Sequence, residues 1–277
     1  MAIGVLRAFG VGATVARGAL NWILSDQKSS GLVRTNFRGR QVTLAGGPAL
    51  AIGATAGAVV GAPGVRAKAA ALTAGAVAGA VGFYDDVAGN RPEQKGAKGF
   101  AGHLGALREG QVTSGLAKVA GVGAAGLVAS SLLGSKHTGF RRGVDVMLGA
   151  GVIAGMANLV NLLDLRPGRA IKAGLVAGAP LAVGPGGGIA AGALGAAGAL
   201  LPADLGEDIM VGDSGANALG ALLGVALAAR TGTAGRFLAL TVLASLTAAS
   251  ERVSFTKVIA ETLWLRAADE LGRQPVA

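Results

Sequence analysis

The chain has 277 residues and a mass of 26.8 kDa, with 52% apolar residues, 14% charged residues and a mean hydropathy of +0.57. Soluble domains carry about 25% charged residues, so this chain is short of polar surface. Its apolar content excludes intrinsic disorder, and the absence of cysteine excludes a disulfide scaffold, thiol catalysis and cysteine-ligated metal. Two histidines are too few for a histidine-rich metal site. The class that remains is an integral membrane protein built of small-residue helices.

The net charge of +10 raises the question of a nucleic-acid partner. Nucleic-acid grooves need clustered Lys and Arg and usually aromatic platforms. Aromatic residues make up only 4% of this chain, and its basic residues stand singly between apolar runs. The charge pattern therefore predicts positive loops beside a membrane and no nucleic-acid partner.

Apolar segments long enough to cross a bilayer, roughly 20 residues each, predict an all-α polytopic protein with about nine transmembrane helices. They lie at about 3–24, 42–61, 67–84, 114–134, 144–163, 170–184, 187–203, 214–230 and 234–250. Residues 1–250 thus form a single transmembrane domain. Arg7 and Arg17 interrupt the first segment, so an amphipathic helix in the membrane interface is its alternative.

Glycine and alanine recur at every third or fourth position of many segments, as at Gly75, Gly79 and Gly82. Small residues let helix backbones approach closely in lipid. A GC-rich genome that favours Ala and Gly codons is the alternative explanation.

Basic residues in the connections predict the orientation. With the N-terminus outside, the inward segments hold 15 Lys and Arg and the outward segments hold 7. This bias places 251–277 in the cytoplasm, where residues 254–271 are expected to form an amphipathic helix.

Acidic residues are scarce, and four of them fall at ends of predicted spans. Asp85 and Asp86 end the third span, Asp164 ends the fifth and Asp213 opens the eighth, all on the cytoplasmic side. Carboxylates at a membrane are costly unless they meet a cation, a partner or water. Mg²⁺ prefers oxygen ligands and is usually held by one or two carboxylates plus substrate phosphates. The sequence therefore predicts a Mg²⁺ site on this face, with Mn²⁺ as the alternative ion.

Each of these signals also has a structural explanation. The acidic pair could be a solvated helix end, and the Gly212–Gly215 segment could be a helix cap with a tight turn. Asn158, Asn161 and Asp164 share one helix face, where polar contacts between helices are the alternative to a binding site. Their joint occurrence on one predicted face favours a functional site.

Three motifs in this order resemble the signature of the polyprenyl-phosphate N-acetylhexosamine-1-phosphate transferases, the superfamily that includes the lipid I-forming translocase. The motifs are GFYDD at 82–86, NLVNLLD at 158–164 and MVGDSGAN at 210–217. Residues 36–47 and 95–110 resemble the first and second cytoplasmic loops of the family. The resemblance covers roughly residues 30–260.

The resemblance implies an enzyme of the cell membrane with its active site on the cytoplasmic face. A polyprenyl phosphate attacks the sugar-linked phosphate of a UDP-N-acetylhexosamine, releases UMP and starts a cell-envelope glycan. Asp213 is implied as a Mg²⁺ ligand with Asp86 as the second. Asp85 and Asp86 form an acidic pair, one of which deprotonates the lipid phosphate.

The resemblance also implies how the donor is bound. Asn158 and Asn161 are expected near the nucleotide and diphosphate, and Asp164 near the uridine. Lys95 is expected to face the donor diphosphate, with a snorkelling interfacial lysine as the alternative.

The chain departs from the family in two places. Typical members have about ten spans and a histidine-containing loop between the last two, whereas 251–277 contains no histidine. Asp164 is followed by Leu165-Arg166-Pro167, where the family more often continues with Gly. These departures leave the identity of the donor open. A catalytically inactive protein that binds the lipid carrier, a small-molecule transporter, and assembly as a homodimer remain alternatives.

Overall fold

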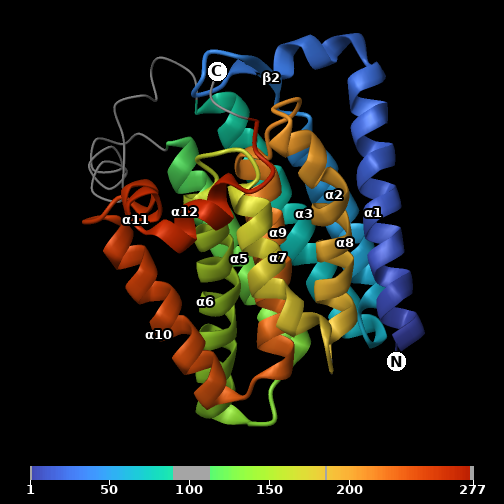
Figure 1. Cartoon of the computed structure of the whole chain (residues 1–277). Helices are drawn as coiled ribbons and strands as arrows, with labels where there is room; N and C mark the ends of the chain where they lie inside the picture. The colour runs from blue at the N-terminus through green and yellow to red at the C-terminus, as the bar shows by residue number, and fades with distance from the viewer. Residues whose placement is uncertain (1, 90–112, 185, 275–277) are drawn as a thin grey trace.

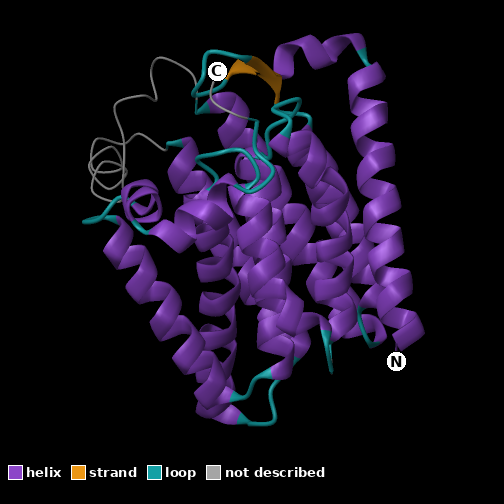
Figure 2. Ribbon diagram, in the orientation of Figure 1, coloured by secondary structure: helices purple, strands orange, loops and turns teal. Residues whose placement is uncertain are grey.

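The computed structural model describes residues 2–89, 113–184 and 186–274, and most of them lie in helices (Figures 1 and 2). In chain order the helices are α1 (Ala2–Ser25), α2 (Gly46–Gly61), α3 (Gly64–Ala88), α5 (Ser114–Leu133), α6 (Gly139–Leu163), α7 (Arg169–Gly178), α8 (Gly187–Leu205), α9 (Gly212–Arg230), α10 (Thr233–Ser250), α11 (Phe255–Glu261) and α12 (Leu263–Glu270). Two 3-10 helices, η1 (Gln27–Leu32) and η3 (Ala179–Ala182), and two short strands, β1 (Val33–Thr35) and β2 (Gln41–Thr43), complete the described elements.

Six of the described helices, α1, α3, α5, α6, α8 and α10, are long and apolar enough to cross a membrane. This finding agrees with an all-α polytopic membrane protein. Each of the nine predicted spans coincides with a helix, although α2 is a shorter apolar helix and the segment at 170–184 is divided into α7 and η3. The count of nine spans and the orientation stay predictions.

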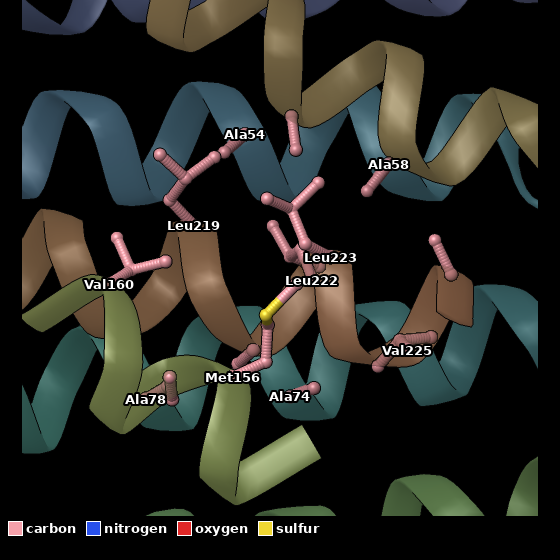
Figure 3. Close-up of a cluster of buried hydrophobic side chains, with 14 of the residues drawn as sticks. Ala54, Ala58, Ala74, Ala78, Met156, Val160, Leu219, Leu222, Leu223 and Val225 are labelled. Carbon is pink, nitrogen blue, oxygen red and sulfur yellow. The ribbon is translucent and has the colours of Figure 1, made fainter. Parts of the chain in front are cut away.

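Helix α9 forms the centre of the bundle and packs against α2, α3 and α6. Its residues Leu219, Leu222 and Leu223 are fully buried. Figure 3 shows these leucines between alanines of α2 and α3 and Met156 of α6. The peripheral helices α1 and α10 keep large apolar side chains such as Trp22 exposed, as expected of surfaces in contact with lipid.

Glycines lie where helix backbones touch. A Cβ added to Gly192 of α8 would lie 2.0 Å from the carbonyl carbon of Gly57 in α2, and one added to Gly12 of α1 would lie 2.0 Å from the Gly192 oxygen. Gly75 and Gly79 of α3 likewise face side chains of α2 at less than contact distance. These positions agree with small residues acting as helix contacts, whatever the codon usage.

Helix α1 runs lengthwise beside α2 and α8 (Figure 1). Ala8, Gly12 and Ala16 form its buried stripe at four-residue spacing, whereas Arg7 and Arg17 are exposed. The two arginines that interrupt the apolar segment therefore point away from the bundle, and α1 packs as the neighbouring spans do.

One end of the bundle carries most of the irregular structure. We call it the polar end: α3 ends there, α9 begins there, and β1, β2, α11 and α12 lie there (Figure 1). Strands β1 and β2 pair antiparallel, and β2 also bridges to Ile209, where the Met210 amide donates to the Thr43 carbonyl at 2.7 Å. The sequence did not predict these strands, since three-residue strands leave little periodicity.

The expected amphipathic helix at 254–271 is divided in two. Thr262 has an extended backbone (φ −98°, ψ 110°) between α11 and α12. Leu263, Trp264 and Leu271 are exposed, while Asp269 is largely buried against the bundle. The break allows α12 to dock on the start of α7.

Candidate active site

Asp86 joins the end of α3 to the beginning of α9. Its Oδ1 accepts a hydrogen bond from the Asp213 amide and its Oδ2 accepts one from the Ser214 amide, both at 2.9 Å. A carboxylate at a helix N-terminus satisfies free amides and favours the helix dipole. The predicted cap at Gly212–Gly215 thus exists, but its side chain comes from α3.

Two glycines make room for this contact. A Cβ on Gly82 would lie 2.4 Å from the Asp213 carbonyl oxygen. Gly212 has a positive φ of 58°, and a Cβ there would lie 2.9 Å from both Asp86 carboxylate oxygens. The close approach of α3 and α9 therefore requires glycine at both positions.

Lys118 of α5 lies between two of the predicted catalytic carboxylates. Its Nζ is 2.7 Å from Asp85 Oδ2 and also forms an ion pair with Asp213 Oδ2. The three side chains come from α5, α3 and α9 and expose 17%, 14% and 28% of their surface, so the cluster is partly shielded from water. The Ser214 hydroxyl donates to the Gly79 carbonyl at 2.9 Å and holds the helix behind the cluster.

The sequence analysis did not identify Lys118. The signal was present, because Lys118 is the only charged residue of the predicted span 114–134. An ionisable residue inside a span is by default a functional candidate whose partner should be sought.

Asp164 lies beside this cluster and opens onto a cavity. The cavity has a volume of about 330 Å³, and its lining includes Phe37, Asp164, Arg166, Asp204 and Met210. Burial raises the pKa of Asp164 well above its usual value, and the negative charges of Asp204, Asp213 and Asp86 add to the increase. The structure thus brings Asp164 into the neighbourhood of Asp86 and Asp213, as the sequence predicted.

The opposite wall of the cavity is built from the loop between β1 and β2. Glu207 accepts a hydrogen bond from Asn36 Nδ2 at 2.5 Å and pairs with Arg38 at 3.0 Å. The Arg166 guanidinium stacks 4.3 Å from the Phe37 ring centre and connects the two walls. Glu207 has a left-handed backbone (φ 59°), which is strained for a residue other than glycine. Its buried hydrogen bond with Asn36 and ion pair with Arg38 offset this strain.

The remaining predicted binding residues are not all at the cluster. Asn158 Nδ2 donates to Thr247 Oγ1 of α10 at 3.0 Å, which is the polar helix–helix contact given as its alternative. Within the described ranges, the buried Oδ1 of Asn161 has no hydrogen-bond partner. Lys95 lies outside the described residues.

The predicted metal site can be compared with the donor atoms present. No group of three or more His, Cys, Asp or Glu side chains in the part of the chain that the structure describes is arranged to hold a metal ion. Asp85 and Asp213 nevertheless turn one oxygen each toward a single cation, the Lys118 ammonium. Two carboxylates completed by water and substrate phosphates are a usual Mg²⁺ donor set. The residues fit such an ion, and Asp85 is better placed beside Asp213 than Asp86, which caps α9.

Comparison with known proteins adds no family: no protein-family profile and no curated protein matches the chain.

Proposed function

We propose that the chain is a Mg²⁺-dependent transferase of the cell membrane. It moves a sugar-1-phosphate, as N-acetylhexosamine-1-phosphate, from a UDP-sugar to a polyprenyl phosphate and releases UMP. The protein crosses the membrane nine times with its N-terminus outside and its polar end in the cytoplasm. The observation that carries the proposal is the convergence of Asp85, Lys118 and Asp213 from three helices at the polar end. It supports the transferase resemblance because Asp85 and Asp213 come from two of the three motif regions, and the charges of Asp86 and Asp213 act on Asp164 of the third.

The chemistry explains why such a cluster is needed. An oxygen of the lipid phosphate forms a bond to the sugar-linked phosphorus, and the bond from that phosphorus to UMP breaks, with UMP keeping the electron pair. Both reactants are anionic, so positioning and charge stabilisation dominate catalysis. Lys118 supplies a fixed positive charge, and Mg²⁺ held by Asp213 and Asp85 would neutralise phosphate oxygens.

Asp85 and Asp86 take different roles in this proposal. Both oxygens of Asp86 accept backbone amides, so Asp86 is a positioning residue that fixes the start of α9. Asp85 is the member of the pair that faces Lys118. It is therefore the one assigned to deprotonate the lipid phosphate.

The polar end offers separate places for the two substrates. A polyprenyl phosphate keeps its tail in the bilayer and its phosphate at the ends of the spans, where the cluster lies. The cavity of about 330 Å³ is large enough for the uridine part of the donor, and Asp164 and Phe37 in its wall supply an acceptor and an aromatic surface. Asn161, with a free buried amide oxygen among the described residues, lies one turn before Asp164 and is retained as a donor-binding residue.

The test is UMP release by purified protein in detergent with UDP-GlcNAc, undecaprenyl phosphate and Mg²⁺, with parallel mixtures lacking lipid or metal. Asp213→Asn and Lys118→Gln should each abolish turnover while the folded protein stays in the membrane. Lys68→Gln is the matched control, because Lys68 is exposed near the beginning of α3, far along the helix from Asp85.

Two outcomes would overturn the proposal. Full activity of both site variants would remove the cluster from the reaction. No UMP with any of several UDP-sugars, from folded protein that still binds undecaprenyl phosphate, would favour the catalytically inactive carrier-binding protein.

A further inference from the structure

The C-terminal residues 269–274 contact both of the loops that contribute the walls of the donor cavity. Arg273 Nε donates to the Pro167 carbonyl at 2.9 Å, on the wall formed by the connection between α6 and α7. Arg38 Nη2 donates to the Gln274 carbonyl at 3.0 Å, directly beside Phe37 on the opposite wall. A segment far along the chain thus connects two loops that otherwise meet through the stacking of Arg166 on Phe37.

A buried ion-pair network anchors this segment. Arg169 donates through Nε and Nη2 to the two oxygens of Asp269, both at 2.8 Å, and Arg273 donates to Asp269 Oδ1 at 2.6 Å. These side chains are at most 10% exposed, so the pairs are shielded from water and salt. A bidentate Arg–carboxylate pair fixes orientation as well as distance. The network therefore holds α12 in one position on the bundle.

The helix termini add to the anchoring. Arg169 is the first residue of α7, where a positive charge is unfavourable unless a carboxylate such as Asp269 accompanies it. Lys172 Nζ donates to the carbonyls of Ala268 and Asp269, at 3.1 and 2.7 Å, in the last turn of α12. A cation at carbonyls of a helix C-terminus is favourable. Both contacts make docking of α12 depend on the beginning of α7, which is separated from Asp164–Pro167 only by Gly168.

We propose that residues 269–274 form a clasp that holds the two walls of the cavity at the separation needed to bind the donor. Asp269 and Arg273 are positioning residues: they do not line the cavity, and they act through Pro167, Arg169 and Arg38. The inference rests on the proposed function, in that the cavity takes the nucleotide end of a UDP-sugar.

The clasp predicts a selective kinetic effect. Arg273→Ala removes the contacts with Pro167 and Asp269 but leaves Asp85, Lys118 and Asp213 in place. Its KM for UDP-GlcNAc should rise about tenfold, the size expected for a lost charged hydrogen bond. The KM for undecaprenyl phosphate and kcat should stay near the wild-type values. Arg266→Ala, at an exposed position of the neighbouring helix α12, is the matched control and should leave all three constants unchanged.

Hydrogen exchange of the full-length protein in detergent gives a readout independent of turnover. In Arg273→Ala, amide exchange should increase in both walls, at 34–42 and 163–169, and not in α9. Asp269→Asn tests the same clasp at its anchor should Arg273→Ala fail to fold. Faster exchange confined to α11 and α12, with an unchanged KM, would overturn the clasp. If the wild-type protein releases no UMP, the proposed transferase fails, and the exchange pattern still decides whether the clasp holds the walls.

Discussion

Replacing Gly82 with Ala tests whether contact between α3 and α9 sets the geometry of the cluster. The added Cβ would lie 2.4 Å from the Asp213 carbonyl oxygen, whereas ordinary contact begins at 3.4 Å, so the helices must separate by roughly 1 Å. The nearest atoms are backbone atoms of Asp213 and Ser214, which cannot rotate away as a side chain can. Asp213 must then move relative to Asp85 and Lys118.

The size of the effect follows from two opposing contributions. Ala raises intrinsic helix stability over Gly by about 1 kcal/mol, whereas overpacking costs about 1–3 kcal/mol. Gly82→Ala should therefore lower the free energy of unfolding, or leave it little changed, where an unobstructed Gly→Ala raises it. A displacement of about 1 Å at reacting groups lowers rates by roughly 100-fold. The loss of UMP release should consequently be much larger than the loss of stability.

Gly123→Ala in α5 provides the control, because nothing lies within 4 Å of the added Cβ. Thermal unfolding in detergent and kcat for UMP release would be measured for both variants and the wild type. Gly123→Ala should match or exceed the wild type in both. If Gly82→Ala behaves like Gly123→Ala, close packing of α3 on α9 does not position Asp213 and the reasoning fails.

Three further changes probe other contacts. Asp86→Asn leaves one amide of α9 without an acceptor and should lower the free energy of unfolding by about 1–2 kcal/mol. Asp208→Asn, at an exposed position, is the control and should leave it unchanged. Equal melting temperatures of the two variants would contradict the capping role of Asp86. Asn158→Ala should keep UMP release within a few-fold of the wild type, because the side-chain amide of Asn158 is hydrogen-bonded to Thr247. A loss of activity as large as that of Lys118→Gln would instead indicate that Asn158 binds the donor. Burial acts to raise the pKa of Asp269, but hydrogen bonds from Arg169 and Arg273 outweigh burial and lower this pKa. The Asp269 carboxylate therefore stabilises the docking of α12 at pH values above the unfolded pKa of about 4. This stabilisation is lost as the pH falls through the lower pKa of the folded state. Protease cleavage within α11 and α12 should therefore increase only at acid pH, and a rise near neutral pH would refute that assignment.

The helices could be predicted because long apolar segments require them in a membrane. Residues 114–134 and 214–230 differ from α5 and α9 by no more than two residues at either end. Backbone groups in lipid must bond within their own segment, so apolar length alone determines the element. That rule gives no information about the loop at the polar end, where β2 pairs with Ile209 across more than 160 residues of sequence.

The site could be predicted only in part, since spacing along a helix does not determine which neighbour a side chain meets. Asn158 and Asp164 lie on one predicted face, yet Asn158 contacts α10 whereas Asp164 opens onto the cavity. The i, i+3, i+6 pattern drifts around the helix over two turns, and α6 ends at Leu163, so Asp164 leaves the helical direction altogether. Asp85 and Asp86 show the same effect, because adjacent helix positions point about 100° apart and reach Lys118 and α9 respectively.

The charge balance of the cluster explains why an acidic site is placed in a basic membrane chain. Asp85 and Asp213 brought together without a cation would repel each other in a partly shielded site. Lys118 compensates one of the two charges while α3, α5 and α9 stay packed, and in the proposed transferase the remaining negative charge would attract the divalent ion. The apolar spans form the scaffold, and Lys118 within one of them provides the positive charge that lets Asp85 and Asp213 lie close together.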